Sequence, residues 1–551
     1  MSAYGTLSKE QLIAEIKRLK KGKKFGLLWE DKREDVAELC KTKLPVLVGV
    51  EDKEISDGSR DSTNILIEGD NYHALSVLNY THKGKIDVIY IDPPYNTGNN
   101  DFKYNDRYVD REDSYRHSKW LSFMSKRLQL ARNLLTNEGV IFISIGDDEV
   151  AQLKLICDEI FGENNLLSII SRKSKATSNK GNFFSPSTDY ILVYARNYLL
   201  LSEFDDPLAQ TADKYLKLFR HEDKRGKYNL VSLYMPSLDP RPNQRYYITC
   251  PDGTKVITPE EDKMFRWIPE TFNKNLKDDR VVFVKTKTSP LIDARGNRSK
   301  WNIYTKIYLH ERQESGMKPL TFIDIPNSLG SKELIKMGID FPFSKPRQLV
   351  EHLIRITDKP KDIYVLDFFA GSGSAGHGVL SLNNEDDGKR IFILCTNNEE
   401  NICTNICYPR IKKAILGYTS PKGEKVKGLG GSLKYFRTDF VDADPTDKNK
   451  KKLTEMATEM LCLKEGTFEK VTNKKAFKIY KNTKHYTGII FDQMAIPDFK
   501  EAIAKLKGKF SVYVFSLGDD SFEDEFKDIM QKVKLSPIPE VILRVYRRIF
   551  K

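Results

Sequence analysis

The stretch Ile86-Asp-Val-Ile-Tyr-Ile-Asp-Pro-Pro-Tyr-Asn-Thr-Gly98 decides the fold. Five of its first six residues are apolar, which predicts a strand that is buried on both faces of a parallel sheet. Pro93 and Pro94 end that strand, because proline has no backbone N–H to donate to a neighbouring strand. We therefore expect Asp92 and Tyr95 at the carboxyl end of the strand, where open α/β sheets bind their ligands.

The same stretch offers two hydrogen-bond acceptors beside an aromatic ring. The carboxylate of Asp92 and the carbonyl of Pro93 can each receive an N–H group, and the fixed φ of proline leaves that carbonyl little freedom. Tyr95 adds a ring on which a flat heterocycle can stack. This set suits an exocyclic amine on such a heterocycle. The alternative is that the two prolines only end a strand and that Tyr95 is a packing residue.

Length and charge favour several domains and a polyanionic partner. A chain of 551 residues is long enough for two to four domains. Its 90 Lys and Arg against 77 Asp and Glu give a formal charge of +13, which suits nucleic acid, although a merely basic cytoplasmic protein would share it. No run approaches the roughly 18 apolar residues of a membrane span, and the first residues lack the apolar core of a signal peptide. We expect a cytoplasmic protein that does not contact a membrane.

The cysteines predict neither disulfides nor a metal site. Seven cysteines are scattered along the chain, which is not the pattern of a disulfide framework. Cys403 and Cys407 lie four residues apart, but no second pair with zinc-ligand spacing is near them. Free, buried thiols are expected instead.

The N-terminal half predicts an arm followed by a wound sheet. Residues 1–50 are expected to form a helical arm, with Leu12, Ile13, Ile16 and Leu19 on one face. Residues 51–163 alternate between strand and helix patterns, which is typical of a parallel, doubly wound sheet. Asp70 is expected at the carboxyl end of the first strand and next in space to Asp92.

Residues 164–338 break this alternation and predict an inserted α+β domain. Short aromatic strands alternate there with polar loops, and basic residues cluster near its start. Interleaved basic and aromatic residues suit contacts with phosphates and bases. The candidates for DNA contact are Arg172, Lys173, Lys175 and Lys180. A domain of the same build that binds nothing is the alternative.

The wound pattern resumes over residues 339–440. A strand ends at Asp367 and runs into Gly371-Ser-Gly373-Ser-Ala-Gly376, and a further strand follows before Glu399. This segment and residues 51–163 are expected to be halves of one sheet. Residues 441–551 then predict a smaller C-terminal α/β domain for assembly or partner binding, with a flexible joint at 447–452, a helix at 522–533 and a final strand at 540–550.

The glycine-rich loop predicts a nucleoside cofactor that carries positive charge. Its glycines match a dinucleotide fingerprint, which alone would suggest NAD. Asp367 argues against NAD, because a carboxylate before the glycines opposes a pyrophosphate. S-adenosylmethionine has an ammonium and a sulfonium and no phosphate, so Asp367 suits it. Glycines allow close backbone approach, and Glu399 can accept both ribose hydroxyls.

Asp92-Pro93-Pro94-Tyr95 resembles the catalytic motif of amino-group DNA methyltransferases, in the form that favours adenine N6 over cytosine N4. The glycine loop resembles the cofactor motif of the same enzymes, and the order of the motifs resembles their beta arrangement, in which the insert recognises the target. Most of the chain resembles the modification (Mod) subunit of type III restriction-modification systems. The resemblance links Asp70 and Lys345, which precedes Pro346, to cofactor binding.

The resemblance implies a doubly wound, Rossmann-like methyltransferase sheet with an inserted α+β target-recognition domain. It implies methyl transfer from S-adenosylmethionine to a flipped adenine in double-stranded DNA, with Phe369 packing against the cofactor. A homodimer and a helicase-nuclease restriction subunit are the expected partners. Two alternatives stay open, an N4-cytosine enzyme and a DNA-binding subunit with a vestigial site. The turn Cys395-Thr-Asn-Asn-Glu399 departs from many relatives, so Glu400 could replace Glu399 as the ribose ligand.

Overall fold

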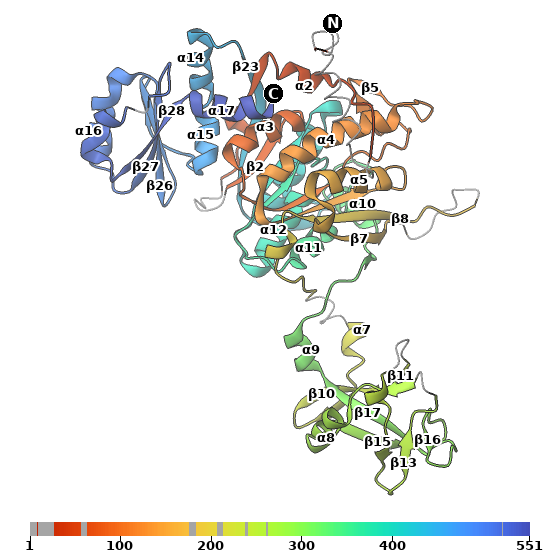
Figure 1. Ribbon diagram of the computed structural model, residues 1–551. Helices are drawn as coiled ribbons and strands as arrows, with labels where there is room; N and C mark the ends of the chain where they lie inside the picture. The colour runs from red at the N-terminus through yellow and green to blue at the C-terminus, as the bar shows by residue number, and fades with distance from the viewer. Residues whose placement is uncertain are drawn as a thin grey trace. The chain divides into compact units, whose positions relative to one another are not determined.

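The computed structural model describes residues 8, 27–56, 63–175, 183–206, 213–236, 241–260, 263–520 and 522–550. The chain forms two compact units (Figure 1). The larger unit comprises Met1–Ser202, Leu320–Ile354 and Lys359–Lys551, and the insert unit comprises Glu203–Pro319 and Arg355–Asp358. The predicted helical face at Leu12, Ile13, Ile16 and Leu19 lies outside the described residues.

A ten-stranded sheet, counted over the described residues, forms the centre of the larger unit. All of its strands point the same way except the first and the eighth, which run antiparallel to their neighbours. In spatial order the strands are β1 (Lys43–Gly49), β23 (Ser432–Asp442), β2 (Thr63–Glu68), β20 (Ile391–Thr396), β19 (Tyr364–Asp367), β3 (Ile86–Ile91), β6 (Leu135–Ile145), β8 (Thr188–Ala195), β7 (Leu166–Lys173) and β18 (Phe322–Ile323).

Strands from before and after the insert interleave in this sheet. β19 pairs in parallel with β3, with Leu366 opposite Ile89, and β20 pairs in parallel with β2. This confirms that the two distant segments build one α/β sheet. β2 and β3 are not neighbours, however, because β20 and β19 lie between them. The expectation that Asp70 lies next to Asp92 is therefore wrong, and Asp367 ends the strand beside that of Asp92.

Helices cover the sheet as expected for a doubly wound fold. α3, α4 and α5 pack on one another, and α12 packs on α13 and against β20. Because β2, β20, β19 and β3 are parallel, their carboxyl ends lie at one edge of the sheet. The helices are α3 (Asn71–Thr81), α4 (Arg116–Leu134), α5 (Val150–Phe161), α11 (Arg347–Arg355), α12 (Ser374–Asp386) and α13 (Tyr408–Leu416).

Two predicted segments, the arm and the insert, have wrong boundaries, because strands assigned to them join the central sheet. β1, which was assigned to the arm of residues 1–50, pairs antiparallel with β23. β7, β8 and β18, which were assigned to the insert, extend the sheet beyond β6. The compact insert therefore runs over Glu203–Pro319 and not over residues 164–338. The sequences of β1, β7, β8 and β18 predict strands, but they do not predict which sheet these strands join, since that depends on neighbours that are distant in sequence.

The insert unit is of the expected α+β kind. Its main sheet contains β15 (Val281–Lys285), β17 (Trp301–Tyr308), β10 (Gly226–Ser232) and β9 (His221–Asp223), in that order. Helix α8 (Pro269–Lys277) packs against β15. A core of Leu233, Val256, Phe265, Phe272 and Ile303 holds these elements together.

The C-terminal segment carries its own five-stranded sheet, counted over the described residues. Helices α14 (Asp447–Met456), α15 (Thr458–Glu465) and α17 (Glu540–Ile549) lie between this sheet and the central one, since α15 and α17 both contact α3. The strands are β24 (Glu469–Asn473), β25 (Phe477–Lys481), β26 (His485–Ile490), β27 (Lys509–Phe515) and β28 (Val533–Ile538), and α16 (Ile496–Ala504) packs on them.

Three local predictions for this segment are wrong. The expected joint at 447–452 opens helix α14, whose first turn is capped by the side chain of Thr446. The expected final strand is helix α17, which buries Ile542 and Tyr546 four residues apart on one face. The expected helix at 522–533 is a 3₁₀ segment, Glu523–Ile529, followed by a strand.

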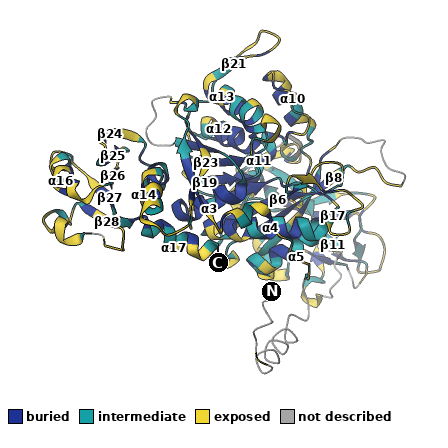
Figure 2. Ribbon diagram, turned by 90° about the horizontal axis from the view of Figure 1, so that it is seen from above, coloured by how far each residue is buried: buried dark blue, intermediate teal, exposed yellow. Residues whose placement is uncertain are grey.

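Burial follows the central sheet, where Figure 2 shows the strands largely buried between helices. All seven cysteines are buried and free, as predicted. Within the described residues, no helix combines the length and the apolarity that crossing a membrane would require.

Candidate active site

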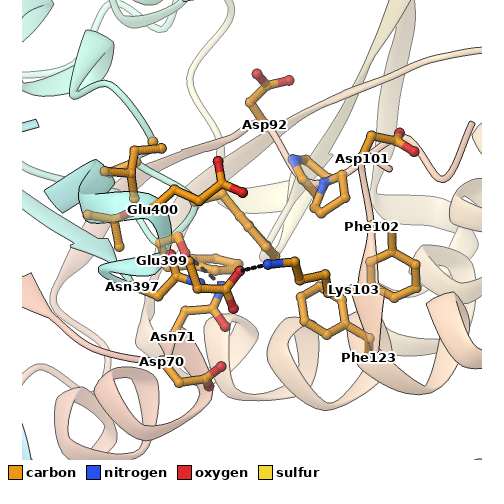
Figure 3. A pocket seen from close by; sticks show the side chains of 18 of the residues that line it. Asp70, Asn71, Asp92, Asp101, Phe102, Lys103, Phe123, Asn397, Glu399 and Glu400 are labelled. Carbon is orange, nitrogen blue, oxygen red and sulfur yellow. Dashed lines mark hydrogen bonds and ion pairs between the residues drawn. The ribbon is translucent and has the colours of Figure 1, made fainter. Parts of the chain in front are cut away.

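A cavity of about 700 Å³ lies in the larger unit at the carboxyl ends of the central strands. This is within the usual size of small-molecule sites. Each of four neighbouring strands brings one acidic residue to it, namely Asp70 after β2, Glu399 after β20, Asp367 at the end of β19 and Asp92 after β3. Figure 3 shows Asp70, Asp92, Glu399 and Glu400 around this cavity.

Asp92 is held by a lysine from the segment before helix α11. Lys345 Nζ lies 2.7 Å from Oδ1 and 2.8 Å from Oδ2 of Asp92, and it donates a third bond of 3.0 Å to the hydroxyl of Tyr95. The Lys345 ammonium thus occupies acceptor positions on Asp92 where an exocyclic amine would donate. The predicted cofactor residue Lys345 is in direct contact with the catalytic motif.

Two residues that sequence reasoning missed, Trp120 and Gly146, contact the proline motif and fix its position. The indole of Trp120, on α4, is fully buried and donates a 2.8 Å bond to the carbonyl of Pro94. Gly146, just after β6, lies under the ring of Tyr95, so that a Cβ there would lie 2.8 Å from Tyr95 Cδ2. The Tyr95 ring therefore depends on a glycine for its position. The only sequence signal was that both residues belong to elements flanking the motif.

Tyr95 is also connected to a buried ion pair. Its hydroxyl donates to Asp189 Oδ2 at 3.4 Å, and Asp189 accepts two bonds from the guanidinium of Arg172 across the β7–β8 pair. Arg172 is fully buried and also donates to Asn327. The prediction that Arg172 contacts DNA is therefore wrong, because its charge is internal and compensates Asp189.

The other predicted DNA contacts differ in accessibility. Lys173 is 40% exposed and lies 3.8 Å from Asp324, and Lys175 is exposed. Lys180 lies outside the described residues. Lys173 and Lys175 remain candidates for contact with phosphates.

Asp367 is a buried carboxylate with no cationic partner among the described residues. It is 2% exposed, and its Oδ1 accepts a 2.9 Å bond from the backbone N–H of Phe369. Burial, together with the nearby charge of Asp92, raises the pKa of Asp367 well above its usual range, although the Phe369 bond opposes this. Phe369 lines the same cavity. A positively charged ligand group would compensate Asp367, so the carboxylate fits the charges of S-adenosylmethionine.

The glycine loop has the backbone that its sequence requires. Gly371 has a φ of 49° and Gly373 one of 78°, a region that favours glycine. A Cβ at Gly376 would lie 2.9 Å from Ile411 Cδ1 and from Leu394 Cδ1, so this glycine allows helix α12 to approach the sheet closely.

Arg410 on α13 organises this loop, and sequence reasoning missed it. It is fully buried, and its Nη1 donates to the hydroxyls of Ser344, Ser372 and Ser374 at 2.8 to 3.1 Å. Its Nη2 lies 2.6 Å from Glu333. Since Ser374 Oγ also donates to the carbonyl of Lys345, Arg410 connects the glycine loop to the lysine that holds Asp92. No local motif surrounds Arg410, so the sequence carried no signal for it.

Asp70 and its neighbours form one wall of the cavity. Asp70 caps helix α3 by accepting a 2.7 Å bond from the N–H of Tyr72, and Arg127 Nη2 lies 3.4 Å from its Oδ1. The buried Arg127 also pairs with Glu34 at 2.7 Å, so a residue of the predicted arm, residues 1–50, contributes to this wall. Arg127 lies on α4, and sequence reasoning did not single it out.

A hairpin from the loop after the proline motif contacts the turn that follows β20. Lys103 on this hairpin pairs with Glu399 at 2.9 Å (Figure 3), and Tyr108 Oη donates to Glu400 at 3.4 Å. Glu399 and Glu400 both line the cavity. Glu400 has a φ of 50°, so the turn after β20 is sharply bent between the two carboxylates. The choice between them as ribose ligand stays a prediction.

The sequence matches a family model described as DNA methylase over residues 86–406. It is 34% identical to the type III restriction-modification enzyme StyLTI Mod subunit of Salmonella typhimurium over 61% of this chain and 53% of that one. It is 31% identical to the type II methyltransferase M.KpnI of Klebsiella pneumoniae over 71% of this chain and 93% of that one. The chain thus spans about half the length of the StyLTI subunit.

Among solved structures, the cytosine-N4-specific PvuII DNA methyltransferase is similar at a TM-score of 0.32, with 11% sequence identity over 65% of this chain and 94% of that one. The strand order described above defines the fold independently of this likeness.

Proposed function

Because the chain belongs to the DNA methylase family, we propose that it transfers a methyl group from S-adenosylmethionine to adenine N6 in double-stranded DNA. One observation carries the proposal: Asp92 and Asp367 end neighbouring strands, β3 and β19, and open onto one cavity. Donor and acceptor of the methyl group can therefore meet between them.

The residues around Asp367 would hold the cofactor. Asp367 compensates the positive charge of the methionine end, Phe369 packs against the ligand, and the backbone of Gly371 and Gly373 allows close approach. Asp70 and Glu399 line the same cavity and would accept hydrogen bonds from the cofactor. When bound, S-adenosylmethionine supplies an activated methyl group on its sulfonium.

The residues around Asp92 would hold and activate the target amine. Asp92 and the carbonyl of Pro93 accept the two N6–H bonds, which draws the nitrogen towards sp³ geometry and aims its lone pair at the methyl group. The base must leave the duplex to reach this point, at a cost of a few kcal/mol, and stacking on Tyr95 offsets part of it. The rest of the acceleration comes from positioning in a site that excludes water.

The target base has to displace the Lys345 ammonium from Asp92. Its ammonium bonds both oxygens of Asp92, so the incoming amine must displace it from at least one of them. Lys345 keeps a second anchor, since its backbone carbonyl accepts a 2.7 Å bond from Ser374. The side chain can therefore turn while the segment stays fixed to the glycine loop.

The likeness to the StyLTI Mod subunit supports a role as the modification subunit of a type III restriction-modification system. Double-stranded DNA would be read by the insert unit and held by Lys173, Lys175 and Lys180 at the backbone. A second copy of the chain and a helicase-nuclease restriction subunit would be its protein partners, in the cytoplasm.

The product identifies the reaction. DNA incubated with the protein and S-adenosylmethionine should yield N6-methyladenine when its nucleosides are separated and weighed by mass spectrometry. N4-methylcytosine would show the alternative specificity, and no methylated nucleoside would contradict the proposal. Single-molecule sequencing of the same DNA would give the sequence around each modified base.

A further inference from the structure

Two adjacent phenylalanines on the segment that leads into β8 are exposed to solvent. Phe183 is 94% exposed and Phe184 is 90% exposed. Single exposed apolar residues are common on proteins, but two adjacent phenyl rings without cover mark a surface that meets something else. Figures 1 and 2 show the described part of this segment, residues 183–187, leading away from the end of β8.

This segment begins at the active-site edge of the sheet. β8 runs antiparallel to β6, with Tyr190 opposite Ile145, so the start of β8 lies at the carboxyl end of β6. That is the edge onto which Asp92 and Tyr95 open. The segment is also connected to the site directly, because Asp189 on β8 accepts the bond from the Tyr95 hydroxyl.

Hydrogen bonds to the residues directly after β7 fix the residues between Phe184 and β8 in place. The N–H groups of Ser174 and Lys175 both donate to the carbonyl of Ser187, which continues the β7–β8 pairing beyond the strands. Pro186 limits the backbone between this point and Phe184. Asp189 lies five positions after Phe184, a distance that at full extension spans at most about 18 Å.

We propose that Phe183 and Phe184 insert into the DNA duplex at the gap that the flipped adenine leaves. Proteins that distort DNA often wedge apolar side chains between base steps, and phenylalanine is among the residues used. The rings are exposed and adjacent, and they precede Asp189, which bonds Tyr95, the residue that would stack the flipped base. The basic Lys173 and Lys175 lie at and just beyond the end of β7, which pairs with the same segment. This inference rests on the proposed function. It adds a contact in which the phenyl rings occupy the space that the flipped adenine leaves between its neighbouring bases.

The test uses the full-length protein and two duplexes that contain its methylated sequence. In one duplex the target adenine is paired, and in the other it faces an abasic position and is already free to leave. F183S/F184S should lower kcat/KM on the paired duplex at least about tenfold, since flipping costs a few kcal/mol and the wedge stabilises the flipped state. On the abasic duplex the variant should stay within about threefold of the unchanged protein, because no base pair has to be opened there and flipping costs less.

Two further variants make the result specific. F183L/F184L keeps apolar wedges and should retain most of the activity on the paired duplex. Met494→Ala removes a side chain that is 80% exposed elsewhere in the larger unit, and it should change nothing. The fluorescence of 2-aminopurine at the target position should rise on binding of the unchanged protein and much less with F183S/F184S.

Equal activity of F183S/F184S and the unchanged protein on the paired duplex would overturn the wedge, as would an equal loss on both duplexes. A change of native mass in F183S/F184S would also overturn it, since a second copy of the chain would then be the partner of these rings. Failure of the proposed function differs from all of these, because the unchanged protein itself would then methylate neither duplex.

Discussion

Lys345 and Asp92 form an ion pair in which the lysine Nζ lies 2.7 and 2.8 Å from the two carboxylate oxygens. The pair joins the segment before α11 to the end of β3, and it includes the hydroxyl of Tyr95 at 3.0 Å from Nζ. One ammonium therefore positions both side chains that the target base would meet. Through Ser374 and Arg410 the same lysine segment is fixed to the glycine loop.

Replacing this lysine should impair methyl transfer more than DNA binding. Lys345→Met keeps the length of the side chain but removes the bonds to Tyr95 and to the second oxygen of Asp92, which remain when the target amine occupies the first oxygen, so Asp92 and Tyr95 lose their common anchor. We expect kcat to fall at least about tenfold, because a hydrogen bond to a charged group contributes roughly 1.5 to 3 kcal/mol. Steady-state methylation measures kcat, and gel-shift titration measures DNA affinity. Lys389→Met, at an exposed position outside the cavity, is the control, and an unchanged kcat in Lys345→Met would refute this role.

Arg172 should behave as an internal residue and not as a DNA contact. Arg172→Ala leaves Asp189 buried without its cation, which should lower the free energy of unfolding by about 3 to 5 kcal/mol. Lys175→Ala, three positions along the chain and exposed, should leave stability unchanged and weaken DNA binding in a salt-dependent way. Urea unfolding and DNA titrations at two salt concentrations separate these outcomes. If the Arg172→Ala protein were as stable as the unchanged protein and its DNA affinity depended less on salt concentration, Arg172 would be a DNA contact after all.

Cofactor affinity should increase with pH because of Asp367. Burial raises the pKa of Asp367, so at low pH the group is protonated and cannot compensate a positive ligand. Affinity for S-adenosylmethionine should therefore increase as the pH is raised above the usual titration range of an aspartate, and it should level off once the carboxylate is ionised. Calorimetric titration at several pH values measures this slope.

Asp367→Asn should bind the cofactor weakly at every pH and lose the slope. Asp87→Asn is the matched control, because burial also raises the pKa of Asp87 but this residue does not line the cavity. It should keep the slope of the unchanged protein. An Asp367→Asn protein with an unchanged slope would assign the titration to another group.

Arg410 should determine the shape of the glycine loop. Arg410→Lys keeps the charge but cannot bond Ser344, Ser372, Ser374 and Glu333 together, so the loop should lose its fixed geometry. We expect cofactor affinity to fall about tenfold or more. Arg390→Lys, at a buried arginine paired with Asp386 outside the cavity, is the control. Calorimetric titration of both variants checks the expectation, and equal affinities would contradict it.

The sequence predicted those site residues that lie directly after a strand. Asp92 and Asp367 each follow a short apolar run, so their place at one sheet edge follows from the fold class. Arg172 was not predictable as a buried residue, because its partner Asp189 meets it only through the register of the β7–β8 pair. Arg410 carries no local motif, and it meets its three serine partners only when α13 packs on α12.

The wrong element boundaries have a common physical cause. β-branched and aromatic residues favour strands locally, but Val541, Ile542, Val545 and Tyr546 have the spacing of a helical face, and that spacing decides the structure of α17. The strands β1, β7 and β8 were readable as strands. Their membership of the central sheet depends on neighbours far along the chain, which local patterns do not specify.

Methyl transfer by the Asp92→Ala variant tests the central claim most directly. Labelled S-adenosylmethionine and DNA are incubated with the unchanged protein and with the variant, and label in DNA is counted while DNA binding is measured in parallel. We predict N6-methyladenine with the unchanged protein, and no transfer but nearly unchanged DNA binding with Asp92→Ala. Undiminished transfer by Asp92→Ala would contradict the assignment of the target amine to this site.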